Sequence, residues 1–195
     1  MRHKFFTQDR IVIFDTEYTC WEGSQERKWS GSGEYREIIQ IGAVLVETNG
    51  FTELDKFLVF VRPSLNPLLS AYCSRLTGIT QEALDKNGVS LSEAVRHFAE
   101  WAGSYTLGAY GADSEVIREN CKLIGIEFPF GSERFFNLRE TFRRYGIDDT
   151  KYYSSTIVEA FGKKPMRRGH DALNDARTLA EGLGYLQEQI NRQGS

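Results

Sequence analysis

The chain has 195 residues, of which 41% are hydrophobic and 26% are charged, a balance typical of a globular domain with one sizeable core. The formal net charge of −3 at pH 7 excludes a strongly basic molecule, so any nucleic-acid binding requires a local basic patch or metal ions. Three cysteines without close spacing indicate reduced thiols, and there is no apolar run of membrane length. The sequence predicts one domain over residues 1–195, with a core of about 10–190, in the cytoplasm and without membrane contact.

The first predicted element is a strand over residues 10–18 (RIVIFDTEY), whose apolar, β-branched start is typical of a buried strand. Side chains alternate along a strand, so Asp15 and Glu17 point to the same side. Two facing carboxylates repel each other, and burial raises the cost further. Mg²⁺ and Mn²⁺ prefer carboxylate oxygens and would relieve both effects. A lone Asp-x-Glu pair also fits a solvated strand end, so a metal site needs further ligands elsewhere in the chain.

A charged, Gly/Ser-rich loop is predicted over residues 21–35, and it contains Trp21 and Trp29. These rings either stack on nucleic-acid bases or fold back on the core, and the sequence leaves open whether the loop closes over a substrate. Strands follow at 37–47 and 56–61, and their short links predict an antiparallel meander with the first strand.

Helical patterns come next. Helices are predicted over residues 67–75, after Thr80 as an N-cap, and after Ser90, which forms a capping-box pattern with Glu93. A turn is expected at 76–79, between the first two helices.

The second half alternates strands and helices. Residues 104–110 are predicted as a strand, residues 135–138 as a strand or helix start, and helices are expected after Asp113 and over 139–145, 155–161 and about 170–190. In the last helix, apolar residues spaced three or four apart mark the packing face: Ala172, Ala176, Leu179, Leu183, Leu186 and Ile190. Three strands followed by this alternation predict an α/β domain with a mixed sheet and helices on its faces.

Two later carboxylates extend the idea of a metal site. Asp113 follows the fourth predicted strand at a helix start, and Asp175 lies one turn inside the last helix, five residues after His170. Only the fold can bring these residues to Asp15 and Glu17.

Taken together, these motifs resemble those of a known enzyme superfamily. The segments Asp15-Thr16-Glu17, Asp113 and His170-x₄-Asp175-Ala176 resemble the three motifs of the DEDD exonuclease superfamily in its histidine (DEDDh) variant. Over about residues 10–185, the chain is similar to the enhanced-RNAi type of 3′→5′ exoribonucleases in further segments: residues 37–44 (EIIQIGAV), 61–63 (VRP), Leu69-Ser70-x-x-Cys73 and 76–80 (LTGIT).

The resemblance implies a ribonuclease-H-like fold with a mixed five-stranded sheet, and phosphodiester hydrolysis with two Mg²⁺ or Mn²⁺ ions per site. By analogy, Asp15 bridges both ions. Glu17 and Asp175 complete the site of the ion on the nucleophile side, and Asp113 supports the other ion. His170 acts as the general base, since imidazole titrates near neutrality.

The second motif departs from the family pattern, Trp-Gly-x-aromatic-Asp. Here it reads Tyr110-Gly111-Ala112-Asp113, one residue shorter and with Tyr in place of Trp. Asp113 remains the natural fourth acid, and Glu115 is a weaker substitute.

The resemblance also implies contacts to the 3′-terminal nucleotide. The corresponding residues are Thr16, Glu17, Tyr18, Leu76, Tyr110 and His170. For Leu76 and Tyr110, plain core packing is the alternative. The basic residues Lys163, Lys164, Arg167 and Arg168 precede His170 and either guide phosphates to the site or form a solvated surface.

The expected partner is single-stranded nucleic acid with a free 3′ end, RNA being favoured, from which 5′-mononucleotides are released. A DNA exonuclease of the same fold is the first alternative, because the 2′-OH contact cannot be read from these residues. The second is a nucleic-acid-binding module without catalysis, which the shortened second motif favours. The sequence predicts no protein partner and no appended RNA-binding domain.

Overall fold

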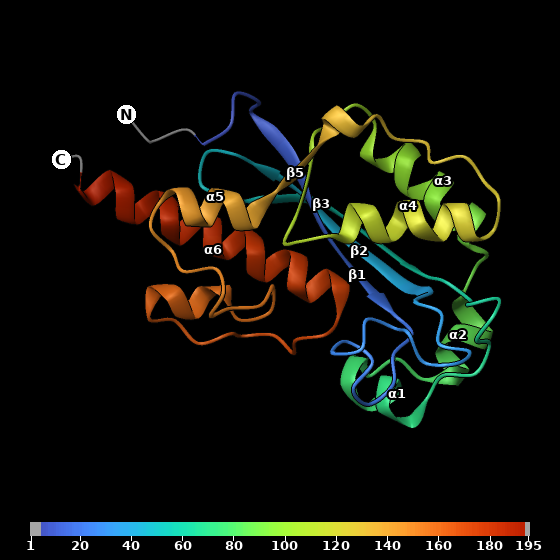
Figure 1. Cartoon of the computed structure of the whole chain (residues 1–195). Coiled ribbons are helices and arrows are strands. Elements are labelled where there is room, and N and C mark those ends of the chain that lie inside the picture. Colours follow the sequence, from blue (N-terminus) through green and yellow to red (C-terminus); the bar gives the residue numbers. More distant parts are fainter. Residues whose placement is uncertain (1–4, 194–195) are drawn as a thin grey trace.

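The computed structural model describes residues 5–193 and contains one mixed sheet (Figure 1). The sheet order is β3-β2-β1-β4-β5. Its strands are β1 (Arg10–Tyr18), β2 (Ile38–Glu47), β3 (Glu53–Phe60), β4 (Leu107–Ala109) and β5 (Phe135–Asn137). β1 pairs antiparallel with β2, and β2 with β3, whereas β4 runs parallel to both β1 and β5. The predicted meander and mixed five-stranded sheet are confirmed.

Helices cover both faces of the sheet (Figure 1). They are α1 (Ala71–Thr77), α2 (Gln81–Asn87), α3 (Leu91–Ala102), α4 (Asp113–Leu123), α5 (Leu138–Arg144) and α6 (Ala172–Gln193), with short 3₁₀ helices at Ser132–Arg134 and Ile157–Phe161. No helix within residues 5–193 is both long and apolar enough to cross a membrane.

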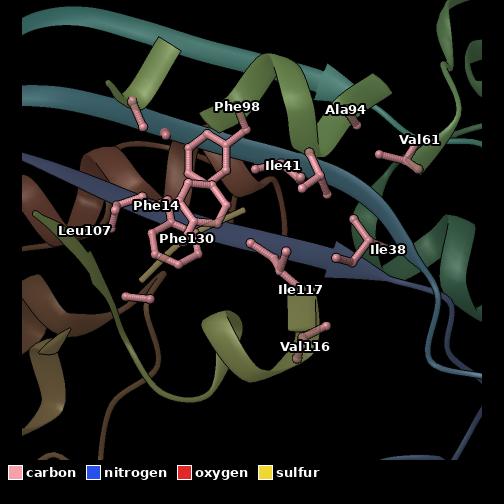
Figure 2. Close-up of a cluster of buried hydrophobic side chains, with 14 of the residues drawn as sticks. Phe14, Ile38, Ile41, Val61, Ala94, Phe98, Leu107, Val116, Ile117 and Phe130 are labelled. Carbon is pink, nitrogen blue, oxygen red and sulfur yellow. The ribbon is translucent and has the colours of Figure 1, made fainter. Parts of the chain in front are cut away.

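The alternation of β1 divides the core into two layers. Val12 and Phe14 face α3 and α4, while Ile11 and Ile13 face α5 and α6. Figure 2 shows the first layer, in which the Phe14 ring centroid lies 5.5 Å from that of Phe98. Because residues 11–14 are all fully buried, β1 is the central strand from which both layers are built.

The predicted packing face of α6 is confirmed, since five of its six apolar residues are buried and Ile190 packs partly buried against the same layer. The helix begins at Ala172, close to the predicted start near His170, which itself lies outside the helix. His170 has a backbone φ of +58°, in the left-handed region that an α-helix excludes.

Other boundaries also differ from the prediction. The first helix begins at Ala71 and not at residue 67, because Ser70 is extended and its side chain caps the helix by accepting a hydrogen bond from the Cys73 N–H. This helix continues through Thr77, so the expected turn at 76–79 is only the left-handed cap at Gly78. The fourth strand is limited to Leu107–Ala109, and the predicted helix at 155–161 is a 3₁₀ helix from Ile157.

Gly42 lets α6 approach the sheet. A Cβ atom built at Gly42 would lie 2.1 Å from the backbone N of Leu173 and 2.4 Å from the carbonyl carbon of Ala172. These backbone atoms cannot move aside as the end of a flexible side chain can. The glycine therefore fixes how closely the first turn of α6 lies against β2.

We expect Gly42→Ala to lower the free energy of unfolding by about 1–3 kcal/mol, because the added methyl group overpacks this contact. Gly184→Ala is the matched control, since its Cβ would meet only the Gly50 carbonyl oxygen at 3.6 Å. In a helix interior the alanine is neutral or stabilises by up to about 1 kcal/mol. Urea unfolding of both variants measures the difference, and equal stability would show that α6 is free to shift.

Candidate active site

Three carboxylates meet where the end of β1 faces α6. Asp15 and Glu17 project from β1, and Asp175 lies in the first turn of α6. One oxygen from each group lies within 4.8 Å of the other two. The three residues are 7%, 8% and 3% exposed, respectively. The alternation that buries Ile11 and Ile13 against α6 thus also directs these two acids to Asp175.

Burial dominates the electrostatics of this cluster. It raises the pKa of Asp15 and Glu17 well above the usual values, and the neighbouring carboxylates raise them further. Burial also raises the pKa of Asp175 to about 7. Asp175 Oδ1 is buried and has no hydrogen-bond partner among residues 5–193. Clustered carboxylate oxygens with an unpaired buried lone pair fit a hard divalent cation such as Mg²⁺ or Mn²⁺.

Two hydrogen bonds hold the Asp175 carboxylate in position. Its Oδ2 accepts hydrogen bonds from the His170 N–H at 3.2 Å and from the Ser154 hydroxyl at 3.3 Å. The buried Gln40 on β2 accepts a hydrogen bond from the Ala172 N–H at 2.8 Å, which fastens the start of α6 to the sheet. The bonds to Asp175 use Oδ2 and leave Oδ1 unpaired.

Asp113 lies on the other side of β1. As the first residue of α4, it accepts hydrogen bonds from the Thr16 N–H at 3.1 Å and the Thr16 hydroxyl at 2.7 Å. Burial raises the pKa of Asp113 above its usual value, and the two bonds from Thr16 offset part of that rise. The shortened second motif therefore still brings Asp113 to β1, although its oxygens are not part of the tight cluster. Glu115 is exposed and accepts a hydrogen bond from Ser114, so it does not replace Asp113.

The imidazole of His170 lies beside the cluster and is partly exposed to solvent. Partial burial of the ring and the nearby positive charge of Arg168 lower its pKa below the usual 6.5. The imidazole is therefore mainly neutral near pH 7, the state in which one ring nitrogen can accept a proton.

One cavity of about 360 Å³ contains every predicted site residue. Its lining includes Asp15, Thr16, Glu17, Tyr18, Leu76, Tyr110, Asp113, His170 and Asp175. Segments separated by up to 160 residues in the sequence thus meet at one surface. Their chemical roles remain predictions.

Tyr110 lines the cavity and also takes part in core packing. Its ring packs against Phe142, at 6.1 Å between centroids, and its hydroxyl donates to the carbonyl oxygens of Asp149 and Tyr152. The Arg139 guanidinium lies 5.3 Å from the ring centroid. Tyr110 is thus a fixed wall of the cavity and also part of the packing.

The loop at 21–35 likewise packs on the core and lines the cavity. The Trp29 indole N–H donates to the Thr19 carbonyl at 2.9 Å, and its ring meets Tyr18 edge-on. Arg36 lies over both rings, at 5.2 Å from Trp29 and 5.5 Å from Tyr18. Trp21 and Trp29 line the cavity, so the loop folds onto the core and forms a wall of the site.

The basic run before His170 is not a free patch. Arg167 pairs with Glu181 at 2.7 Å, and Arg168 donates to the carbonyl oxygens of Arg75 and Leu76. Both arginines thus bind within the fold, which neither proposed reading anticipated. Arg168 holds the cap of α1, next to the Leu76 wall.

Several lining residues escaped sequence reasoning. Ser154 and Ser155 come from the loop after α5, and Arg36 and Arg139 supply positive charge to the cavity. The loop is held by the buried Asp149, which pairs with Arg139 at 2.9 Å and Arg143 at 2.8 Å. No motif marks these residues, because their role depends on contacts between separate elements.

Comparisons with known proteins agree with this geometry. The family model RNase_T, described as an exonuclease, matches residues 12–183. The chain is 37% identical over 210 residues to the 3′-5′ exonuclease Snipper of Drosophila melanogaster, covering 95% of this chain and 70% of Snipper. It is 28% identical over 184 residues to 3′-5′ exoribonuclease 1 of Rattus norvegicus, covering 88% of this chain and 51% of that protein. The chain thus spans about half the length of its mammalian exoribonuclease 1 relatives.

Among solved structures, the nuclease domain of 3′hExo, a DEDDh family member bound to rAMP, superimposes with a TM-score of 0.81. It is 26% identical, and the match covers 94% of both chains. The 3′-exonuclease in the structure of histone mRNA stem-loop 3′-end recognition gives a TM-score of 0.78 at 25% identity, covering 93% of this chain and 65% of that one. The fold is that of the DEDDh exonucleases.

We expect Asp175→Asn to stabilise the metal-free protein at pH 8 by up to about 4 kcal/mol, the equivalent of a pKa raised from 3.8 to about 7. The folded state binds more protons than the unfolded state between these values, so wild-type stability falls as pH rises from about 4 to 7. The variant lacks this loss, and it also gains less stability from Mn²⁺.

Urea unfolding in EDTA and in Mn²⁺, at pH 4.5 and pH 8, measures both effects. Asp148→Asn is the control, because hydrogen bonds with Thr150 and Lys151 lower the pKa of this exposed acid. Its removal therefore brings no gain at pH 8. A wild type as stable at pH 8 as at pH 4.5 in EDTA, and unaffected by Mn²⁺, would contradict the buried-carboxylate account.

Proposed function

Since the chain belongs to the RNase_T exonuclease family, we propose that it is a 3′-5′ exonuclease that releases 5′-mononucleotides from the free 3′ end of single-stranded RNA. The observation that carries the proposal is the shared cavity of His170 and the buried cluster Asp15, Glu17 and Asp175. An unpaired carboxylate oxygen within that cluster supports a function that requires bound cations.

The acids would hold the ions. Asp15, Glu17 and Asp175 would bind one Mg²⁺ or Mn²⁺ ion together, which their close approach supports, and Asp15 would share a second ion with Asp113 on the other side of β1. When bound, two such ions stabilise negative charge on the attacking and leaving oxygens of an in-line displacement.

His170 would act as the general base. An unprotonated nitrogen of its imidazole would accept a proton from the attacking water. The water oxygen then bonds to phosphorus as the bond from phosphorus to the 3′ oxygen of the preceding nucleotide breaks. Partial burial and Arg168 hold the pKa of His170 below its usual value, which keeps the base available near neutral pH. Its backbone bond to Asp175 fixes the base relative to the cluster.

The walls of the cavity would seat the terminal nucleotide. The backbone around Thr16 would contact the sugar, Leu76 would support the base as an apolar wedge, and Tyr18 and Tyr110 would supply flat faces beside it. These residues belong to β1, α1 and the segment after β4, which meet only in the folded chain.

RNA is favoured over DNA because the mammalian relatives are named exoribonucleases and a similar nuclease domain is bound to rAMP. The name of Snipper, a 3′-5′ exonuclease, specifies neither nucleic acid. A DNA exonuclease is therefore the second candidate. The convergence of all four acids and His170 on one cavity argues against an inactive binding module. Free, buried thiols at Cys20, Cys73 and Cys121 support a reducing compartment such as the cytoplasm.

The test uses matched RNA and DNA oligonucleotides labelled at the 3′ or the 5′ end, with Mg²⁺, Mn²⁺ or EDTA. We expect immediate release of a labelled mononucleotide from the 3′ end, dependent on metal. His170→Ala should lower kcat by about 10²–10⁴-fold while oligonucleotide binding remains, because it removes only the proton acceptor. His97→Ala, an exposed histidine on α3, should have full activity.

The ratio of RNA to DNA cleavage decides between the first two candidates. Binding without cleavage under any metal would overturn the enzymatic proposal and favour the binding module. Activity of His170→Ala equal to that of His97→Ala would show that another group accepts the proton.

A further inference from the structure

A second, larger groove adjoins the catalytic cavity. Its volume is about 1050 Å³, and it runs along α5 and β5 at one edge of the sheet. Gly111, Ala112 and Arg139 line both spaces. The two spaces therefore adjoin at these three residues.

The groove carries one arginine that is not compensated by an ion pair. Arg139, Arg143 and Arg144 of α5 line it together with the acids Glu115 and Glu140, and Asp149 pairs with the first two arginines. The catalytic cavity beside it is rich in carboxylates, which repel phosphates wherever no cation intervenes. The exposed Arg144 therefore offers a positive charge to a phosphate beyond these acids.

The arginines differ in what they are free to bind. Arg139 and Arg143 are held by the buried Asp149, so their positions are fixed. The Arg144 side chain is exposed and has no hydrogen bond or ion pair with any of residues 5–193. Its charge is thus available to a ligand.

Aromatic side chains form the floor beside these charges. Phe6, Phe135 and Phe136 line the groove and are partly buried. The Phe136 ring is fixed by Phe6, at 5.0 Å between centroids, and by β4, where a Cβ on Gly108 would meet it at 2.4 Å. Fixed aromatic rings among arginines are typical of surfaces that bind single-stranded nucleic acid.

A competing route leaves the cavity on the opposite side. A groove of about 520 Å³ shares Trp29 and Arg36 with the catalytic cavity. There Lys28 and Arg36 are balanced by Glu34 and Glu119, and Arg36 is already paired with Glu119. This route has about half the volume of the groove along α5 and β5.

We propose that the groove along α5 and β5 binds the nucleotides on the 5′ side of the scissile bond, with backbone phosphates at Arg139 and Arg144 and bases against Phe135 and Phe136. The inference rests on the proposed exonuclease function and deepens it. Five residues of helix separate the two arginines, a rise of roughly 7–8 Å, which spans about two nucleotides.

The test compares Arg144→Glu with two charge reversals outside the groove. Lys86→Glu alters an exposed residue of α2 that lines none of these spaces, and Lys28→Glu alters the competing route. All three are made in the His170→Ala background, so that binding is measured without turnover. The probes are 5′-fluorescein oligouridylates of two, four and eight nucleotides in Mg²⁺, followed by fluorescence anisotropy at several salt concentrations.

We expect Arg144→Glu to raise the Kd of the eight-nucleotide probe by about 5–20-fold at low salt and to make binding less salt-dependent. The dinucleotide, which does not reach Arg144, should bind within about twofold of the parent. Arg144→Gln should give a smaller loss of the same length dependence, and unchanged thermal unfolding shows that the variants fold.

Loss at all lengths equally, or no difference between Arg144→Glu and Lys86→Glu, would overturn the proposal. A length-dependent loss in Lys28→Glu alone would place the strand on the opposite side and also overturn it. The proposed function is judged separately, by cleavage with His170 intact. If that protein cleaves nothing while Arg144→Glu still weakens binding of long probes, the groove stands and the nuclease proposal fails.

Discussion

The structure depends on the way β1 alternates at its end. Odd-numbered residues face α6, so Asp15 and Glu17 meet Asp175 there, while Thr16 faces α4 and meets Asp113. One strand therefore distributes four carboxylates over two sides of itself. A shift of one residue in the pairing of β1 would exchange the two faces and place Asp15 and Glu17 in the aromatic layer of Phe98 and Phe130. The full burial of Ile11 to Phe14 fixes that register.

A cluster of three buried acids works against folding, and the surrounding packing has to oppose it. The first turn of α6 carries Asp175, where the positive end of the helix dipole favours a carboxylate. Gln40 and Gly42 on β2 bring this turn to the sheet, one by a hydrogen bond and the other by the absence of a side chain. The close approach that orders the acids also excludes water from them. Their raised pKa values are therefore a consequence of the same contacts that position them.

Much of this arrangement could be predicted from the sequence because it follows local rules. The alternating pattern of residues 10–18, the capping box at Ser90 and Glu93, and the apolar face of the last helix are all determined within a few residues. Other features depend on partners far along the chain. The bond from Thr16 to Asp113 spans 97 residues, and the contacts of Arg168 with α1 span more than 90. A basic run reads as a free charged surface until those acceptors are in place. The left-handed conformation of His170 likewise has no local signal, since no glycine or asparagine occupies that position.

Asp149 links the wall of the catalytic cavity to the groove along α5. Its buried carboxylate binds Arg139 and Arg143, and its backbone carbonyl oxygen accepts a hydrogen bond from the hydroxyl of Tyr110. The pKa of Asp149 is held below its usual value by these arginines, so the carboxylate stays charged and keeps both cations in place. A single residue thereby orients the cavity wall at Tyr110 and the arginines at the mouth of the groove.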